Sequence, residues 1–95
     1  MIQKPAEERN GREGRTQLII YTRPGCHLCD EMKATVHRVA HASPDPIVIE
    51  EIDISSDADL QRLYGQEIPV LVVRGRKAAK YRISDGELRR ILGAR

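Results

Sequence analysis

The residues with the clearest chemical potential are Cys26 and Cys29, the only two cysteines in this sequence of 95 residues. Two residues separate them, so both sulfur atoms meet on one helical turn and can close and reopen a small disulfide. The pair follows an apolar, strand-like run and precedes a helix-like run. A Cys-x-x-Cys pair in that context is typical of thiol–disulfide redox sites.

Cys26 lies where the chain is expected to pass from strand to helix. A helix start favours an anion because its first N–H groups are unpaired. We therefore expect a lowered pKa for the Cys26 thiol, with Arg23 adding positive charge and Asp30 and Glu31 opposing it. Cys29, one turn further along, should be less exposed. This arrangement predicts Cys26 as the nucleophile and Cys29 as the resolving thiol of a dithiol exchange.

The same cysteine pair is also compatible with half of a metal site, because His37 and His41 follow at helical spacing. If residues 27–41 form one helix, Cys29 and His37 lie about 12 Å apart along its axis. One ion then cannot reach all four side chains within one chain, although half-sites shared between two chains stay open. The strand–turn–helix context favours the redox interpretation, so we predict no metal ligands.

Length and charge narrow the classes of function. The chain is long enough for one domain, and its net charge of +2 gives no argument for nucleic-acid binding. No apolar stretch reaches the length of a membrane span. Residues 1–16 are expected to form a disordered charged tail, with a single domain at residues 17–95. Because the tail lacks the apolar core of a signal peptide, we expect a cytoplasmic protein.

Strand-like and helix-like segments alternate along the domain. We expect strands at residues 17–22, 47–54, 70–73 and 77–83, and helices at residues 27–41, at residues 58–64 and after a capping box at residues 84–87. The first strand–helix–strand unit should be parallel and the last two strands an antiparallel hairpin. Glu50 and Glu51 favour an edge position for the second strand. The predicted core consists of Leu18, Ile20, Leu28, Met32, Val36, Ile49, Ile52, Leu60, Leu63, Val70, Val72, Leu88 and Ile91.

A second signal is the run Ile68-Pro69-Val70. A proline at the first position of a strand lacks only a hydrogen bond that the strand start can spare. A cis bond between Ile68 and Pro69 is one alternative, because cis peptides are confined almost wholly to proline. A trans proline in a loop is the other.

Three segments together resemble the glutaredoxin-like branch of the thioredoxin superfamily: residues 21–29, residues 51–54 and residues 68–71. The resemblance covers residues 17–92 and implies a thioredoxin-like α/β fold of order β-α-β-α-β-β-α, a four-stranded mixed sheet flanked by helices. It also implies a cis Pro69 packed against the cysteine pair, and Ile68 as the residue whose backbone pairs with an extended substrate.

The resemblance further implies that Arg23 binds the terminal carboxylate of glutathione, and that Ser84 and Asp85 lie near its γ-glutamyl end. This sequence differs from the family pattern at several positions. Ile20 replaces the buried acid of thioredoxins, no tyrosine lies beside the cysteines, and the paired glycines expected near residues 81–84 are missing.

We therefore predict a thiol–disulfide oxidoreductase that reduces protein or small-molecule disulfides through Cys26 and Cys29, with Arg23, Ile68 and Pro69 binding the substrate. It would hold no cofactor tightly. Its partners would be a disulfide-containing protein or a glutathione mixed disulfide, with glutathione or thioredoxin reductase as electron donor. We expect no nucleic-acid or membrane partner. An alternative from another class keeps the fold without catalysis, as a binding or redox-sensing module with a metal half-site at the cysteines.

Overall fold

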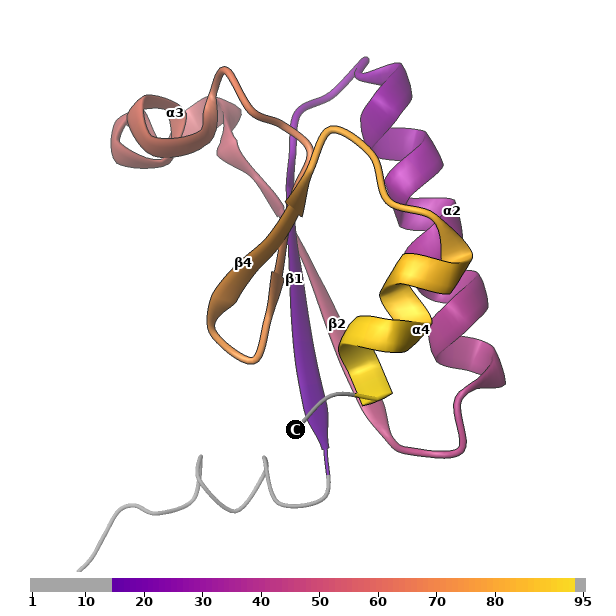
Figure 1. Cartoon of the computed structure of the whole chain (residues 1–95). Helices are drawn as coiled ribbons and strands as arrows, with labels where there is room; N and C mark the ends of the chain where they lie inside the picture. Colours follow the sequence, from indigo (N-terminus) through magenta and orange to yellow (C-terminus); the bar gives the residue numbers. More distant parts are fainter. Residues whose placement is uncertain (1–14, 94–95) are drawn as a thin grey trace, which may run out of the picture.

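In the computed structural model, which describes residues 15–93, four strands form one mixed sheet in the order β2-β1-β3-β4 (Figure 1). The strands are β1 (Thr16–Thr22), β2 (Ile47–Asp53), β3 (Val70–Val73) and β4 (Arg76–Lys80). β1 pairs parallel with β2 and antiparallel with β3, and β3 pairs antiparallel with β4. The predicted mixed four-stranded sheet is confirmed, with β2 at one edge.

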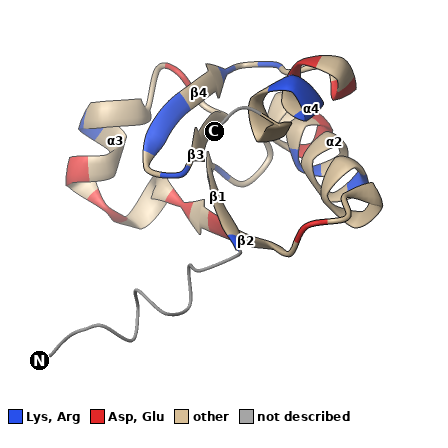
Figure 2. Cartoon of the chain, turned by 60° about the horizontal axis from the view of Figure 1, so that its bottom comes forward, with Lys and Arg blue, Asp and Glu red and all other residues tan. Residues whose placement is uncertain are grey.

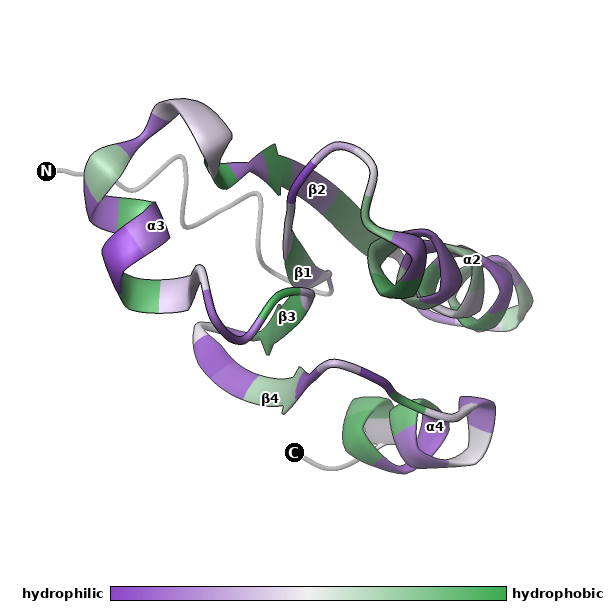
Figure 3. Cartoon of the chain, turned by 90° about the horizontal axis from the view of Figure 1, so that it is seen from above, coloured by the Kyte–Doolittle hydropathy of each residue, from purple (hydrophilic) through white to green (hydrophobic). Residues whose placement is uncertain are grey.

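The helices are α2 (His27–Ala42), α3 (Ala58–Tyr64) and α4 (Asp85–Gly93), with one short 3-10 turn, η1 (Ile54–Ser56). α2 and α4 lie on one face of the sheet and α3 lies on the other (Figure 3). The predicted element order is thus confirmed. Among the described residues, none of the helices has the length and apolar character that a membrane span requires.

The predicted tail at residues 1–16 falls almost wholly outside the described residues, as do residues 94–95 of the predicted domain. Thr16 is described, and it is already the first residue of β1. Its N–H donates to the Pro46 carbonyl at 3.0 Å, which ties the start of β1 to the start of β2. The first strand therefore begins one residue earlier than we expected.

The core lies between the sheet and the pair α2 and α4. Alternate residues of a strand point to the same face, so Leu18 and Ile20 of β1 enter this core together with Leu71 and Val73 of β3. From the helices come Met32, Val36, Val39 and Leu88. Of the predicted core residues, Leu28, Ile49, Ile52, Leu60 and Ile91 are only half-buried.

Leu63 was wrongly assigned to the core, because its side chain is 64% exposed. α3 has only two turns, and the half-buried residues Leu60 and Tyr64, four positions apart, share one face of it. Tyr64 stacks on Tyr21 of β1, with ring centroids 4.3 Å apart. The ring of Tyr64 therefore packs against the sheet, where the sequence pattern predicted Leu63.

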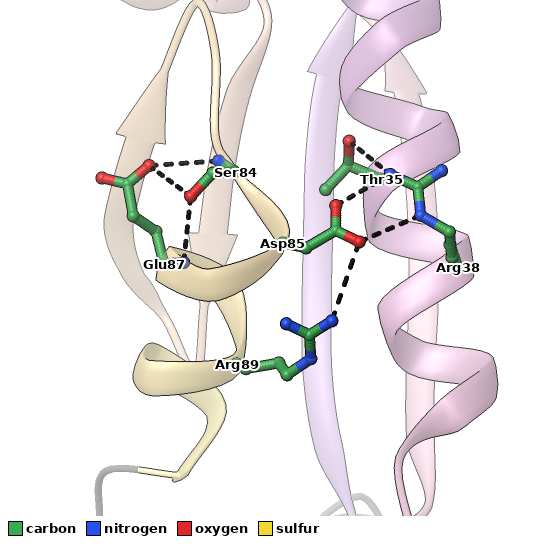
Figure 4. Close-up of polar contacts among 6 residues, drawn as sticks. All are labelled: Thr35, Arg38, Ser84, Asp85, Glu87 and Arg89. Carbon is green, nitrogen blue, oxygen red and sulfur yellow. Dashed lines mark hydrogen bonds and ion pairs between the residues drawn. The ribbon is translucent and has the colours of Figure 1, made fainter.

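The fourth strand ends at Lys80, three residues earlier than predicted. Tyr81 has a φ of +70°, in the left-handed region, which breaks the extended backbone. Residues 81–84 then connect β4 to α4. The predicted capping box follows: the Glu87 N–H donates to Ser84 Oγ at 3.1 Å, and the Ser84 N–H donates to the Glu87 carboxylate at 3.1 Å (Figure 4).

The two edges of the sheet carry opposite charge (Figure 2). β2 holds the acidic residues Glu50, Glu51 and Asp53 at its exposed positions, whereas β4 holds Arg76, Lys77 and Lys80. Charged side chains on an edge strand discourage pairing with another chain through the free backbone groups.

Candidate active site

Cys26 and Cys29 form a disulfide at the start of α2, with their Cα atoms 5.1 Å apart. Arg23, Pro24 and Gly25 separate them from β1, and Gly25 has a φ of +76° that a residue with a side chain rarely adopts. The chain then turns into α2 with Cys26 as its N-cap residue. The turn therefore sets the cysteine pair directly beyond the end of β1.

Cys26 takes the capping role that serine or aspartate usually fills. Its sulfur accepts the Cys29 N–H at an N···S distance of 3.0 Å, and its carbonyl accepts the Asp30 N–H at 3.2 Å. Cys26 is half-buried, whereas Cys29 is only 1% exposed. As expected from the sequence, Cys29 is the less exposed of the two cysteines.

The opposition that we expected from Glu31 is reduced by its neighbours. Its carboxylate lies 2.9 Å from His27 Nε2 and 3.9 Å from Arg82 Nη1. Because Arg82 carries a positive charge close to this carboxylate, the net negative charge of the first turn of α2 is smaller than the sequence suggests.

Pro69 is buried, and its peptide bond to Ile68 is cis. Val70, the next residue, is paired with Tyr21 in the antiparallel register of β1 and β3. Pro69 therefore lies at the end of the sheet from which β1 continues toward Cys26. The topology brings the cysteine pair and the Ile68–Pro69 bond to the same end of the molecule.

The backbone around Ile68 is hydrogen-bonded on both sides. The Gln66 carbonyl accepts the Tyr81 hydroxyl at 3.0 Å, and the Pro69 carbonyl accepts the Tyr81 N–H at 2.8 Å. The Glu67 N–H donates to the Tyr64 carbonyl at 2.8 Å. Within residues 15–93, the N–H and C=O groups of Ile68 itself make no hydrogen bond.

Arg23 reaches from the end of β1 to the end of α3. Its Nη2 donates to the Gly65 carbonyl at 3.2 Å. Arg23 also lines a polar cavity of about 240 Å³ together with Pro24, Gly25 and Lys33. This arginine is thus placed beside the cysteine turn, with one of its donors already used within the protein.

Glu67 precedes Ile68 and is held by two lysines of β4. Its carboxylate lies 2.6 Å from Lys77 Nζ and 3.5 Å from Lys80 Nζ. The hydrogen bond from Lys77 holds the pKa of Glu67 below its ordinary value. Nothing in the sequence indicated this contact or the Tyr81 contacts, because all of them join residues through a strand pairing that only the fold defines.

The histidines considered as metal ligands have other surroundings. His37 Nε2 lies 2.9 Å from a carboxylate oxygen of Glu51 on β2, and the hydrogen bond lowers the pKa of Glu51. His41 is exposed near the far end of α2. Over the described part of the chain, no three His, Cys, Asp or Glu side chains are grouped so as to hold one metal ion.

The sheet order, the helices and the cysteine pair together define a thioredoxin-fold protein with a site of redox type. Within that class, the chain belongs to the family described as Glutaredoxin-like domain (DUF836), which residues 17–93 match. The predicted membership of the glutaredoxin-like branch is confirmed.

Several solved structures are similar to this chain in fold. The protein XcR50 from X. campestris is 32% identical, with a TM-score of 0.66, and the match covers 82% of this chain and 97% of that one. Protein Ne2328 from Nitrosomonas europaea is 29% identical, with a TM-score of 0.66 and coverage of 80% and 89%. Chloroplastic thioredoxin z, at 16% identity, has a TM-score of 0.70 with coverage of 98% and 95%, and shows the fold alone. No curated protein is a significant match.

Proposed function

We propose that this protein is a thiol–disulfide oxidoreductase that reduces protein or small-molecule disulfides through Cys26 and Cys29. The observation that carries the proposal is the unequal exposure of the two cysteines joined in one disulfide. Cys26 is half-buried at the start of α2, and Cys29 is 1% exposed. An incoming disulfide can meet only Cys26, so Cys29 is left to react with Cys26.

The reaction has two steps. The Cys26 thiolate attacks one sulfur of the target disulfide, and the other target sulfur leaves as a thiolate, so that a mixed disulfide forms. The Cys29 thiolate then attacks the Cys26 sulfur and releases the second target sulfur. Two electrons have passed to the target, and the Cys26–Cys29 disulfide is the oxidised product. An external dithiol or two thiols must reduce it before the next turnover.

The position of Cys26 at a helix start supports its role as the nucleophile. Free N–H groups and the helix dipole stabilise negative charge there. The Cys29 N–H, 3.0 Å from the Cys26 sulfur, is one such donor. A sulfur that gains a hydrogen bond in its ionised form is more often present as the thiolate, which is the attacking species in the first step.

We further propose that Ile68 and Pro69 bind the target. The Ile68 N–H and C=O groups make no hydrogen bond within residues 15–93, and an extended peptide can pair with such groups as an added strand. Arg23 uses one donor on the Gly65 carbonyl. A guanidinium has five donors, so Arg23 keeps others for a carboxylate of the substrate.

Protein disulfides are the substrates we favour over glutathione mixed disulfides. The Asp85 carboxylate, which the family resemblance puts near the γ-glutamyl end of glutathione, accepts two hydrogen bonds from Arg38, at 2.8 and 3.0 Å. The paired glycines of the family are also missing from residues 81–84. We propose thioredoxin reductase or glutathione as the electron donor, no tightly bound cofactor, and a reducing compartment such as the cytoplasm.

The proposal is tested by mixing the fully reduced protein with an oxidised protein substrate. The expected result is two new target thiols and one Cys26–Cys29 disulfide for each protein molecule, counted by thiol alkylation and mass spectrometry. A second series compares regeneration by NADPH with thioredoxin reductase against NADPH with glutathione and glutathione reductase. Reduced protein that leaves the target disulfides intact contradicts the proposal.

The non-catalytic alternative makes a different prediction. A binding module with a metal half-site at the cysteines would carry metal shared between two chains and would reduce no disulfide. The His37–Glu51 contact occupies one of the histidines that such a site would need. Metal analysis of protein purified without chelators separates the two: one zinc ion for every two chains, without reductase activity, favours the module.

A further inference from the structure

Tyr81 contacts both ends of the segment that presents Ile68. Its hydroxyl donates to the Gln66 carbonyl at 3.0 Å, two residues before Ile68. Its backbone N–H donates to the Pro69 carbonyl at 2.8 Å, one residue after Ile68. One residue of the β4–α4 connection thus fixes residues 66–69 from both sides.

The backbone of Tyr81 is unusual for a tyrosine. Its φ of +70° lies in the left-handed region, which glycine adopts readily and a residue with a large side chain adopts at a cost. Burial of the side chain does not account for the choice, because Tyr81 is 42% exposed. The contacts that distinguish a tyrosine from a glycine here are the hydroxyl bond to Gln66 and the approach of Lys80 Nζ to its ring, 5.6 Å from the centroid.

The same segment is fastened at a third point by charge. Glu67 lies between Gln66 and Ile68, and Lys77 and Lys80 of β4 hold its carboxylate at 2.6 and 3.5 Å. Contacts thus hold the residues on both sides of Ile68. The Ile68 N–H and C=O groups themselves have no partner within residues 15–93. Ordering a backbone is unfavourable, so a segment that is already ordered binds an extended chain at a lower cost.

We propose that Tyr81 is a positioning residue for substrate docking: it holds residues 66–69 in the conformation in which Ile68 pairs with an extended target chain. This inference rests on the proposed function, and it adds the residue that makes the protein selective for disulfides within extended peptides. A small disulfide has no backbone to pair with Ile68, so its reduction does not depend on Tyr81.

The test compares wild type with Tyr81→Phe, which removes the hydroxyl and keeps the backbone N–H and the ring. Gln61→Met is the matched control. The Gln61 side chain also donates to a backbone carbonyl at 3.0 Å, that of Ser55, which lies outside the docking segment, residues 66–69. Single-turnover rates of the reduced proteins are measured as a function of substrate concentration. One substrate is a disulfide between two extended, fluorophore-labelled peptides, and the other is 2-hydroxyethyl disulfide.

For Tyr81→Phe we expect the half-saturating concentration of the peptide disulfide to rise about fivefold, the effect of one hydrogen bond, with the limiting rate unchanged. The rate with 2-hydroxyethyl disulfide should stay within about twofold of wild type, as should both rates of Gln61→Met. An unchanged peptide reaction, or an equal loss with both substrates, overturns the inference.

A second measurement does not depend on activity. The Glu67 amide, which donates to the Tyr64 carbonyl within the same segment, should exchange faster in Tyr81→Phe than in wild type, at matched thermal stability, and at an unchanged rate in Gln61→Met. Unchanged exchange in Tyr81→Phe overturns the positioning role whether or not the protein is a reductase. Faster exchange in a protein that reduces neither disulfide upholds the positioning of the segment and overturns the proposed function instead.

Discussion

Arg38 and Asp85, 47 residues apart in the sequence, are joined by two nearly parallel hydrogen bonds of 3.0 and 2.8 Å (Figure 4). Arg38 lies in the middle of α2 and Asp85 is the first residue of α4. Arg89, one turn further along α4, lies 3.9 Å from the same carboxylate. The pair ties the helix that carries the cysteines to the helix that completes the core.

This pair predicts a pH dependence of stability. The hydrogen bond from Arg38 lowers the pKa of Asp85 in the folded protein. A lowered folded pKa stabilises the fold above the unfolded pKa of about 3.9, and the contribution is lost as the pH falls through the lower folded value. We therefore expect Arg38→Met to lower the melting temperature slightly at pH 7, and the difference from wild type to shrink as the pH falls below about 3.9.

Melting curves between pH 7 and pH 3 check this expectation. Other carboxylates also have lowered pKa values, so the quantity to compare is the difference between wild type and variant at each pH. The control is Arg62→Met, which removes an exposed arginine of α3 that pairs with Asp59 of that helix. A difference for Arg38→Met that stays constant down to pH 3 would assign its effect to packing of the arginine stem.

The two cysteines should give different phenotypes when replaced singly. Cys26→Ser removes the accessible sulfur, so disulfide reduction should fall at least about a hundredfold. Cys29→Ser keeps the attacking thiol but lacks the resolving thiol, and should accumulate a mixed disulfide with the target. Nonreducing gels and mass spectrometry of each variant mixed with oxidised substrate make the comparison. Trapped adducts on Cys29 in the Cys26→Ser variant would reverse the proposed roles.

Backbone pairing at Ile68 is best tested from the substrate side. A peptide disulfide that is N-methylated at one residue beside its cysteine loses a single N–H donor. If that donor pairs with the Ile68 carbonyl, the second-order rate constant should fall about fivefold, the effect of one hydrogen bond. Scanning the N-methyl group along the peptide provides the controls, because distant positions should have no effect. A flat scan would remove Ile68 from the binding site.

The capping box at the start of α4 makes a stability prediction. Ser84→Ala removes the acceptor of the Glu87 N–H and should cost about 1 kcal/mol of unfolding free energy. In a domain of this size that corresponds to a fall in melting temperature of about 4–8 °C. Ser56→Ala, at an exposed serine of η1, is the matched control. Equal losses for the two serines would show that the cap contributes nothing specific.

Two leucines should separate the core from the surface. Leu88 of α4 is 0% exposed, and Leu88→Ala should destabilise the fold by about 2–5 kcal/mol, from lost burial and the cavity left behind. Leu63 of α3 is 64% exposed, and Leu63→Ala should change stability by less than about 0.5 kcal/mol. Urea unfolding of both variants measures the contrast. A large loss at Leu63 would mean that this side chain is buried in solution.

Local patterns in the sequence were sufficient to predict the helices and strands and to indicate a site of redox type. Helical spacing and β-branched runs predicted the position of each helix and strand to within a few residues, because side-chain periodicity is set locally by the backbone geometry. The Cys26–Cys29 spacing beside a strand indicated redox chemistry, and the motifs around it led to the correct family. The capping box at Ser84 was also correct, since all its atoms lie within one turn.

Tertiary structure alone decided the contacts between distant segments. The end of β4 at Lys80 and the reach of Tyr81 to Gln66 depend on which residues the sheet pairing sets side by side. The exposure of Leu63 depends on how α3 packs against the sheet. Periodicity assigns a side chain to a face but does not say how far a short helix covers that face, as α3 shows. The cysteine pair could be predicted from the sequence because Cys26 and Cys29 are only three residues apart. The contacts of residues 66–69 could not, because they depend on β3 lying between β1 and β4.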